Sequence, residues 1–170
     1  MANNKNNKKK KQQRPGYFQQ NVQQFGEDFL ERKTAKDIER DSQRVFKDIA
    51  FQSPEAMDNI VQYFENRTFL ANLVTSANET LMERYAIYLG LSTYLQMIQQ
   101  NPQQAANGFN IEKYLIKAKN NYDAYCIIVQ YLNNIVSVIN TGYDQSWVYV
   151  NILNNLRSMS AALGPHKYHI

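Results

Sequence analysis

The sequence predicts an all-α protein: a helical bundle of about five to seven helices, preceded by an extended basic N-terminal arm. Apolar residues recur every three or four positions along most of the chain. Glycine is sparse, with 6 in 170 residues, and most prolines stand where helices are expected to begin or end. The β-branched stretch within 122–140 contains no turn residues that would divide it into strands, so we expect a helix there too.

A chain of this length is expected to form a single domain with a substantial core. We assign residues 1–17 to the arm, 18–164 to a single helical domain and 165–170 to a short C-terminal tail. The arm begins MANNKNNKKKKQQRPG and contains no acidic residue. So polar a segment buries too little apolar surface to hold one shape by itself, and we expect neighbouring molecules to order it.

The first three helices are predicted from spacing and from start signals. Residues 18–32 place four apolar side chains on one helical face: Phe18, Val22, Phe25 and Phe29. An approximate capping box at 34–37 begins a second helix, whose apolar stripe runs from Ile38 to Ile49. Ser53-Pro54-Glu55 combines a cap, a proline and an acid, and predicts the start of a third.

The rest of the chain is predicted to contain longer helices. Thr68 opens a short apolar stretch, and a capping box at 76–79 predicts the start of the longest helix, which ends near Gln100, before Pro102. Residues 101–110 are predicted to form a loop. The remaining helices are then expected at 111–119, capped by Asn110, at 122–140, ending before Gly142, and at 144–162, ending at Leu163-Gly164-Pro165.

Charge is distributed very unevenly. The arm carries six positive charges: Lys5, Lys8, Lys9, Lys10, Lys11 and Arg14. The remaining residues hold 13 basic and 15 acidic groups, which gives −2, and residues 85–111 carry no charge at all. The chain instead contains 36 Asn and Gln residues. A surface rich in amides and Tyr but poor in charge is typical of an interface. An AT-rich genome would also favour Asn and Tyr, but it would supply the Lys that this region lacks.

Residues suited to catalysis are few, so we expect no enzyme activity, cofactor, metal or small-molecule substrate. The single cysteine, Cys126, lies in an apolar stretch, and the two histidines, His166 and His169, lie in a C-terminal tail that we expect to be frayed. No phosphate-binding glycine motif is present. The most apolar run, 85–98, is too short and polar to span a bilayer, so we expect no membrane partner.

Aromatic residues and the arm are the candidate contact sites. Six aromatic residues are predicted to lie at subunit interfaces: Tyr85, Tyr88, Tyr94, Tyr122, Tyr131 and Trp147. Stacking on nucleic-acid bases would need basic residues between these tyrosines, and their helices have few. The arm could contact phosphates, as in packaged DNA, through salt-sensitive binding, or it could contact protein. The sequence leaves both partners open.

The MANNKNNKKKK opening, the amide-rich helices and the uncharged C-terminal half resemble virion proteins of AT-rich tailed phages, including the crAss-like group. That resemblance implies a non-catalytic, portal-proximal ring or connector (head-tail joining) protein in the virion, which contacts copies of itself and other virion proteins. Coat proteins of filamentous archaeal viruses are similar in outline and imply a nucleic-acid-coating alternative. The third class is a cellular helical adaptor with a disordered tail.

Overall fold

The computed structural model describes residues 35–52, 56–64, 66–105 and 110–170. These parts of the chain are helical and contain no strand, which confirms the all-α prediction. The arm and the predicted helix at 18–32 lie outside the described residues. The described elements are α2 (Ala35–Phe51), α3 (Met57–Phe64), α4 (Arg67–Gln100), η2 (Pro102–Gln104), α5 (Ile111–Thr141), α6 (Gln145–Leu163) and η3 (Gly164–His169), where η denotes a 3-10 helix.

Side-chain caps and one glycine set the bounds of the long helices. Asn110 accepts a hydrogen bond from the backbone N–H of Lys113 at 3.2 Å, and Asp144 accepts one from Trp147 at 2.7 Å. Each satisfies a donor that the first helical turn would otherwise leave unpaired. Gly142 ends α5 in the left-handed region, with φ of 46°. These three bounds agree with the prediction.

The predicted helix start at 76–79 is wrong, because α4 runs unbroken through it. A capping box marks a helix start only where the residues before it are not helical. The apolar stretch after Thr68 is itself helical. The polar side chains in this stretch form hydrogen bonds that a continuous helix allows. Thr75 Oγ1 and Asn78 Nδ2 each donate to the carbonyl four residues earlier, at 3.0 and 2.9 Å. Ser76 is buried within α4. The helix therefore starts at Arg67, capped by Asn66.

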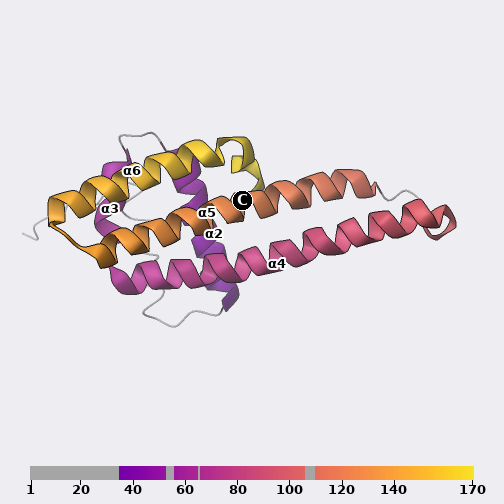
Figure 1. Ribbon diagram of the computed structural model, residues 1–170, viewed down its shortest axis with the longest axis horizontal. Helices are drawn as coiled ribbons and strands as arrows, with labels where there is room; N and C mark the ends of the chain where they lie inside the picture. The colour runs from indigo at the N-terminus through magenta and orange to yellow at the C-terminus, as the bar shows by residue number, and fades with distance from the viewer. Residues whose placement is uncertain (1–34, 53–55, 65, 106–109) are drawn as a thin grey trace, which may run out of the picture.

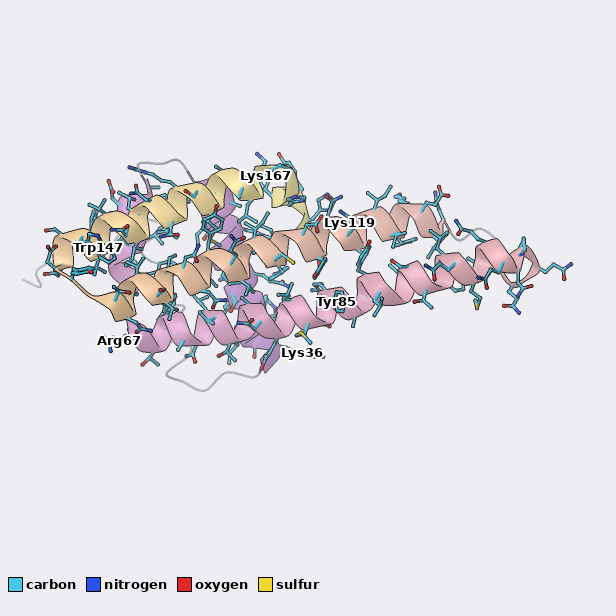
Figure 2. All side chains as sticks on the ribbon, viewed as in Figure 1. Lys36, Arg67, Tyr85, Lys119, Trp147 and Lys167 are labelled. Atoms are coloured by element: carbon cyan, nitrogen blue, oxygen red, sulfur yellow. The ribbon has the colours of Figure 1, made fainter. Side chains whose placement is uncertain are left out.

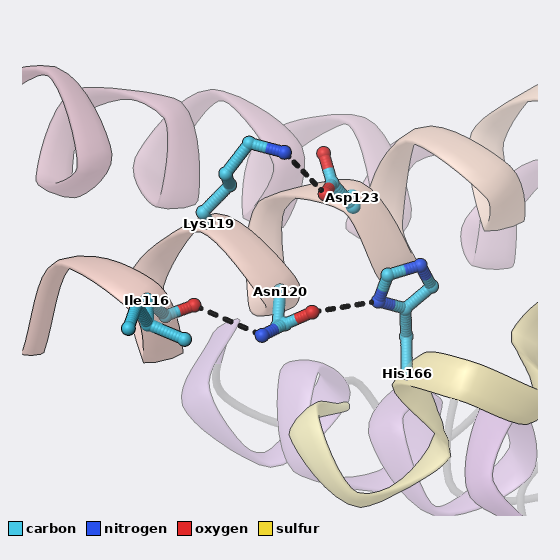
Figure 3. A network of polar contacts seen from close by, with 5 residues as sticks. All are labelled: Ile116, Lys119, Asn120, Asp123 and His166. Atoms are coloured by element: carbon cyan, nitrogen blue, oxygen red, sulfur yellow. Dashed lines mark hydrogen bonds and ion pairs between the residues drawn. The ribbon is translucent and has the colours of Figure 1, made fainter. Parts of the chain in front are cut away.

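The predicted division between 111–119 and 122–140 is also wrong, because α5 is one helix of 31 residues. The Asn120–Asn121 pair resembles a turn in sequence. In the structure, however, Asn120 Nδ2 donates to the carbonyl of Ile116 at 3.1 Å, so the amide supports the helix rather than ending it (Figure 3).

The helices form a bundle at one end of the molecule and a two-helix projection at the other. Figure 1 shows α4 and α5 side by side along the long axis, with α6 alongside the C-terminal half of α5. Helix α3 packs against α6 and α4, and α2 crosses the bundle and contacts both α4 and α6. Of the described elements, α4, α5 and the short η2 that follows α4 extend beyond this bundle (Figure 1).

The core fills the bundle end alone. Its largest fully buried side chains come from every α-helix described, among them Phe46, Phe64, Leu73, Tyr125 and Leu156. The rings of Phe46 and Tyr125 meet edge to face with centroids 6.2 Å apart, and those of Phe64 and Phe69 do so at 6.4 Å. Burial raises the pKa of Tyr125 to about 12, as expected for a phenol inside a core.

The C-terminal tail is anchored, which corrects the expectation of a frayed end. Residues 164–169 form η3, which packs against α5, α6 and α2. His166 Nδ1 lies 3.0 Å from Asn120 Oδ1, and the Asn121 side chain donates to the carbonyl of His169 (Figure 3 shows the first contact). The Lys167 ammonium lies 5.1 Å from the ring centroid of Phe51 at the end of α2. The two histidines are thus part of a packed segment.

Candidate subunit interface on the α4–α5 hairpin

The projecting part of the α4–α5 pair has almost no core of its own. Between Thr80 on α4 and Ala124 on α5, Ile111 alone is buried among the described residues. We call residues 85–105 and 110–119 the distal hairpin. In Figure 2, Tyr85 and Lys119 lie where α4 and α5 leave the bundle. Residues 85–100 of α4 span about 22 Å at the helical rise of about 1.5 Å per residue.

One face of α4 in the distal hairpin meets α5. Tyr88, Leu91, Leu95 and Ile98 recur at helical spacing and are half-buried. The ring of Tyr88 stacks on that of Tyr122 from α5, with centroids 6.0 Å apart and planes 5° from parallel. This face therefore forms the seam between the two helices.

The opposite side of α4 also carries apolar side chains, and among the described residues only the Tyr85 ring is partly covered, by Tyr122 of α5. Met82, Tyr85, Leu89 and Met97 lie on this side and are 68%, 43%, 50% and 39% exposed. We call these four residues the outer stripe. From Tyr85 to the end of α4 no charged residue interrupts the stripe. A helix that is apolar on both sides is normally buried on both sides.

The structure brings three of the predicted interface tyrosines together. Tyr85 and Tyr122 have ring centroids 5.4 Å apart, so Tyr85, Tyr88 and Tyr122 form one aromatic cluster at the base of the distal hairpin. A hydrogen bond with the Cys126 side chain raises the pKa of Tyr122. Of the three, only Tyr85 is counted as exposed, and it also belongs to the outer stripe.

The other predicted interface residues lie apart from this cluster. Tyr94 is half-buried further along α4, and Tyr131 is half-buried against the core. Trp147 is half-buried at the far end of the bundle, where its ring meets that of Tyr143 at 5.2 Å. The predicted contact residues of the arm lie outside the described residues: Lys5, Lys8, Lys9, Lys10, Lys11 and Arg14.

Sequence reasoning missed the aliphatic members of this surface. Met82, Leu89 and Met97 were not among the predicted interface residues, which are all aromatic. A signal was present: Met82 and Leu89 are seven residues apart, and no charged residue occurs from Tyr85 to Ile111. Ile116 of α5, which is 63% exposed, was missed for the same reason.

The described residues hold no arrangement that suggests reaction chemistry. They contain no group of three potential metal-ligating side chains, and no helix among them is long and apolar enough to cross a bilayer. Burial raises the pKa of the Asp48 carboxyl, while nearby Arg44 lowers it. One buried oxygen of Asp48 has no hydrogen-bond partner within the described parts. Burial is the main cause of this shift and Arg44 is the one charged neighbour that opposes it, so the shift is a local effect of burial.

Comparisons of the chain with protein-family models, with curated proteins and with solved structures gave no match.

Proposed function

We propose that this protein is a non-catalytic structural subunit of a multi-chain assembly and that its copies associate through the outer stripe of the α4–α5 hairpin. One observation carries the proposal: the distal hairpin is apolar on two sides of α4 and has no charge from residue 85 to residue 111. Contiguous exposed apolar surface of this kind marks interaction sites in soluble proteins.

The hairpin's construction favours a copy of the same chain as the partner. Two uncharged stripes can meet without leaving an ion unpaired, whereas a charged partner would lose hydration against this surface with no compensating ion pair. Burying the exposed half of a Leu side chain contributes about 1 kcal/mol, so a few such residues supply enough energy for specific association. The projection also leaves both helices accessible along their length.

At the finer level, we propose a portal-proximal ring or connector protein of a tailed-phage virion, with copies of itself and other virion proteins as its partners. The support is the compositional resemblance to such proteins together with the hairpin. In a ring, each subunit presents two different surfaces to its neighbours. The outer stripe would be one contact between copies, and a second contact elsewhere on the bundle would continue the ring.

A pair of charge insertions tests the role of the stripe. Leu89→Glu places a carboxylate on the outer stripe, while Gln130→Glu adds the same group at an exposed position of α5 in the bundle. We expect Leu89→Glu to shift the native mass to that of the monomer and Gln130→Glu to leave the assembly intact. An unchanged mass for Leu89→Glu, with helix content preserved by circular dichroism, would contradict the proposed interface.

The nucleic-acid-coating alternative rests on the six positive charges of the arm. Deleting residues 2–14 removes all six while leaving every described residue in place. If the arm contacts DNA, the intact chain should bind it more tightly at 50 mM than at 200 mM salt, and the deletion should abolish that difference. Salt-independent binding, or none, would remove this alternative.

A further inference from the structure

The base of the distal hairpin carries a groove that is separate from the outer stripe. Helices α4 and α5 and the C-terminal residues 168–170 line an open hollow of about 460 Å3 there. Asn121, Tyr168, His169 and Ile170 line one part of it, and we call the part lined by Arg84, Ile87, Leu91, Tyr114, Lys117 and Ala118 the hairpin groove. The lining is mostly apolar, with one cationic side chain on each wall. Such a groove fits an amphipathic helix that carries acidic residues beside its apolar face.

Helix α2 borders this groove at both of its ends. Near its start, the Glu39 carboxylate lies 3.6 Å from the Arg84 guanidinium on the groove wall. At its end, the Phe51 ring meets the Tyr168 ring at 5.4 Å. Ala35, the first residue of α2, is four residues before Glu39, or about 6 Å along the helix axis. The chain that precedes Ala35 therefore joins the described structure beside the groove.

We propose that the hairpin groove is the docking site of residues 18–32 of the same chain. That segment places Phe18, Val22, Phe25 and Phe29 at helical spacing on one face. As a helix it would be about 21 Å long, close to the 22 Å of α4 in the distal hairpin. Only residues 33 and 34 separate it from α2, so the segment reaches the groove of its own copy without a long connection.

Charge complements the apolar match. Residues 18–32 carry three acids and one base, Glu27, Asp28, Glu31 and Arg32, for a net charge of −2. The groove presents Arg84 and Lys117 from opposite walls. The buried Nε of Arg84 has no hydrogen-bond partner among the described residues, although its guanidinium also faces Glu39. The Arg84 side chain is 24% exposed, so a carboxylate from the segment can pair with the accessible part of its guanidinium.

The groove and the outer stripe lie on different sides of α4. Ile87 and Leu91 line the groove, while Leu89 lies on the stripe. Two positions along a helix are about 200° apart around its axis, so Leu89 and Leu91 point in nearly opposite directions. Docking of 18–32 thus leaves the stripe free for a second copy, and the inference does not depend on the proposed function.

Hydrogen exchange of the full-length protein, followed by mass spectrometry of peptides covering 18–32, tests the docking. We expect these amides to exchange about tenfold or more slowly than in an unstructured chain. Ile87→Glu places a carboxylate at an exposed position of the groove lining, facing the acidic segment, and should remove that protection. Leu89→Glu is the matched control on the opposite side of α4 and should leave the protection intact.

A second variant removes doubt about folding. Phe25→Glu alters the segment and no residue of the described bundle, and it should abolish protection over 18–32 while α5 amides exchange as before. Fast exchange of 18–32 in the unmodified protein would overturn the proposal, as would equal protection in Ile87→Glu. Loss of protection in Leu89→Glu would show that the segment is ordered by assembly rather than by its own groove, and would overturn it too.

Discussion

The side chain of Leu89 offers a quantitative test, because assembly and folding predict different energies for the same truncation. Leu89 is half exposed, whereas Leu132 on α5 is fully buried in the core. Truncating a buried Leu to Ala costs about 2–5 kcal/mol of unfolding free energy. Leu89→Ala leaves no enclosed cavity in the single subunit, so we expect it to cost less than about 1 kcal/mol there.

The two truncations should affect association in the opposite order, with Leu89→Ala having the larger effect. If a second copy covers the exposed half of Leu89, the truncation removes about 1 kcal/mol from each subunit in the contact. In a contact that uses the stripe of both copies, the loss of association free energy is about 2 kcal/mol. The dissociation constant should therefore rise about 30-fold. Leu132→Ala should leave association unchanged at temperatures where the subunit remains folded.

Urea unfolding at low protein concentration and sedimentation equilibrium over a concentration series measure the two quantities separately. The interface reasoning fails if Leu89→Ala weakens association by less than threefold. It also fails if Leu89→Ala destabilises the isolated subunit as much as Leu132→Ala does, because Leu89 would then be part of the fold rather than of a contact.

Three further predictions concern the fold. His166→Ala removes the contact with Asn120 and should lower the unfolding free energy by about 0.5–1.5 kcal/mol in urea, whereas an unchanged midpoint would mean that the tail is not anchored there. Gly142→Ala should destabilise the subunit by about 1 kcal/mol, because φ is positive and the added Cβ would lie 3.3 Å from a carbonyl oxygen. The Cβ added by Gly90→Ala meets no atom within 4 Å, so this variant should stabilise the subunit by about 0.5–1 kcal/mol. Thermal melts that reverse this order would contradict the geometry. Burial raises the folded-state pKa of Asp48 above 3.8, so the charged carboxylate destabilises the fold once the pH rises above 3.8. Asp48→Asn should therefore raise the melting temperature at pH 7 and lose this advantage below pH 3.8. An advantage that persists at low pH would assign the effect to another cause.

Local signals predicted the fold class and several helix bounds, because they act within one turn. Asn110 and Asp144 each accept a hydrogen bond from the backbone N–H three residues later, which caps a helix start. Gly142 ends α5 and donates its N–H to the carbonyl four residues earlier. The same locality explains the two errors. The capping box at 76–79 and the amide pair at 120–121 are start or stop signals only if the neighbouring turn unwinds, and tertiary packing of α4 against α5 keeps both helices continuous.

The candidate interface was predicted only in part for a related reason. The absence of charge located the region 85–111, because composition needs no knowledge of packing. Which face of α4 meets α5, and which stays uncovered, depends on the placement of α2, α3 and α6 at one end of the hairpin alone. The sequence contains no local signal for that placement, so Leu89 and Leu91 cannot be told apart before the fold is known.

The native mass of the purified full-length protein tests the central claim most directly. One chain has a mass of 19.9 kDa. We predict a discrete multiple of that mass, which Leu89→Glu converts to the monomer while Gln130→Glu does not. A single 19.9 kDa species for the unmodified protein, persisting as its concentration is raised, would contradict the claim that this chain is a subunit built to assemble through its hairpin.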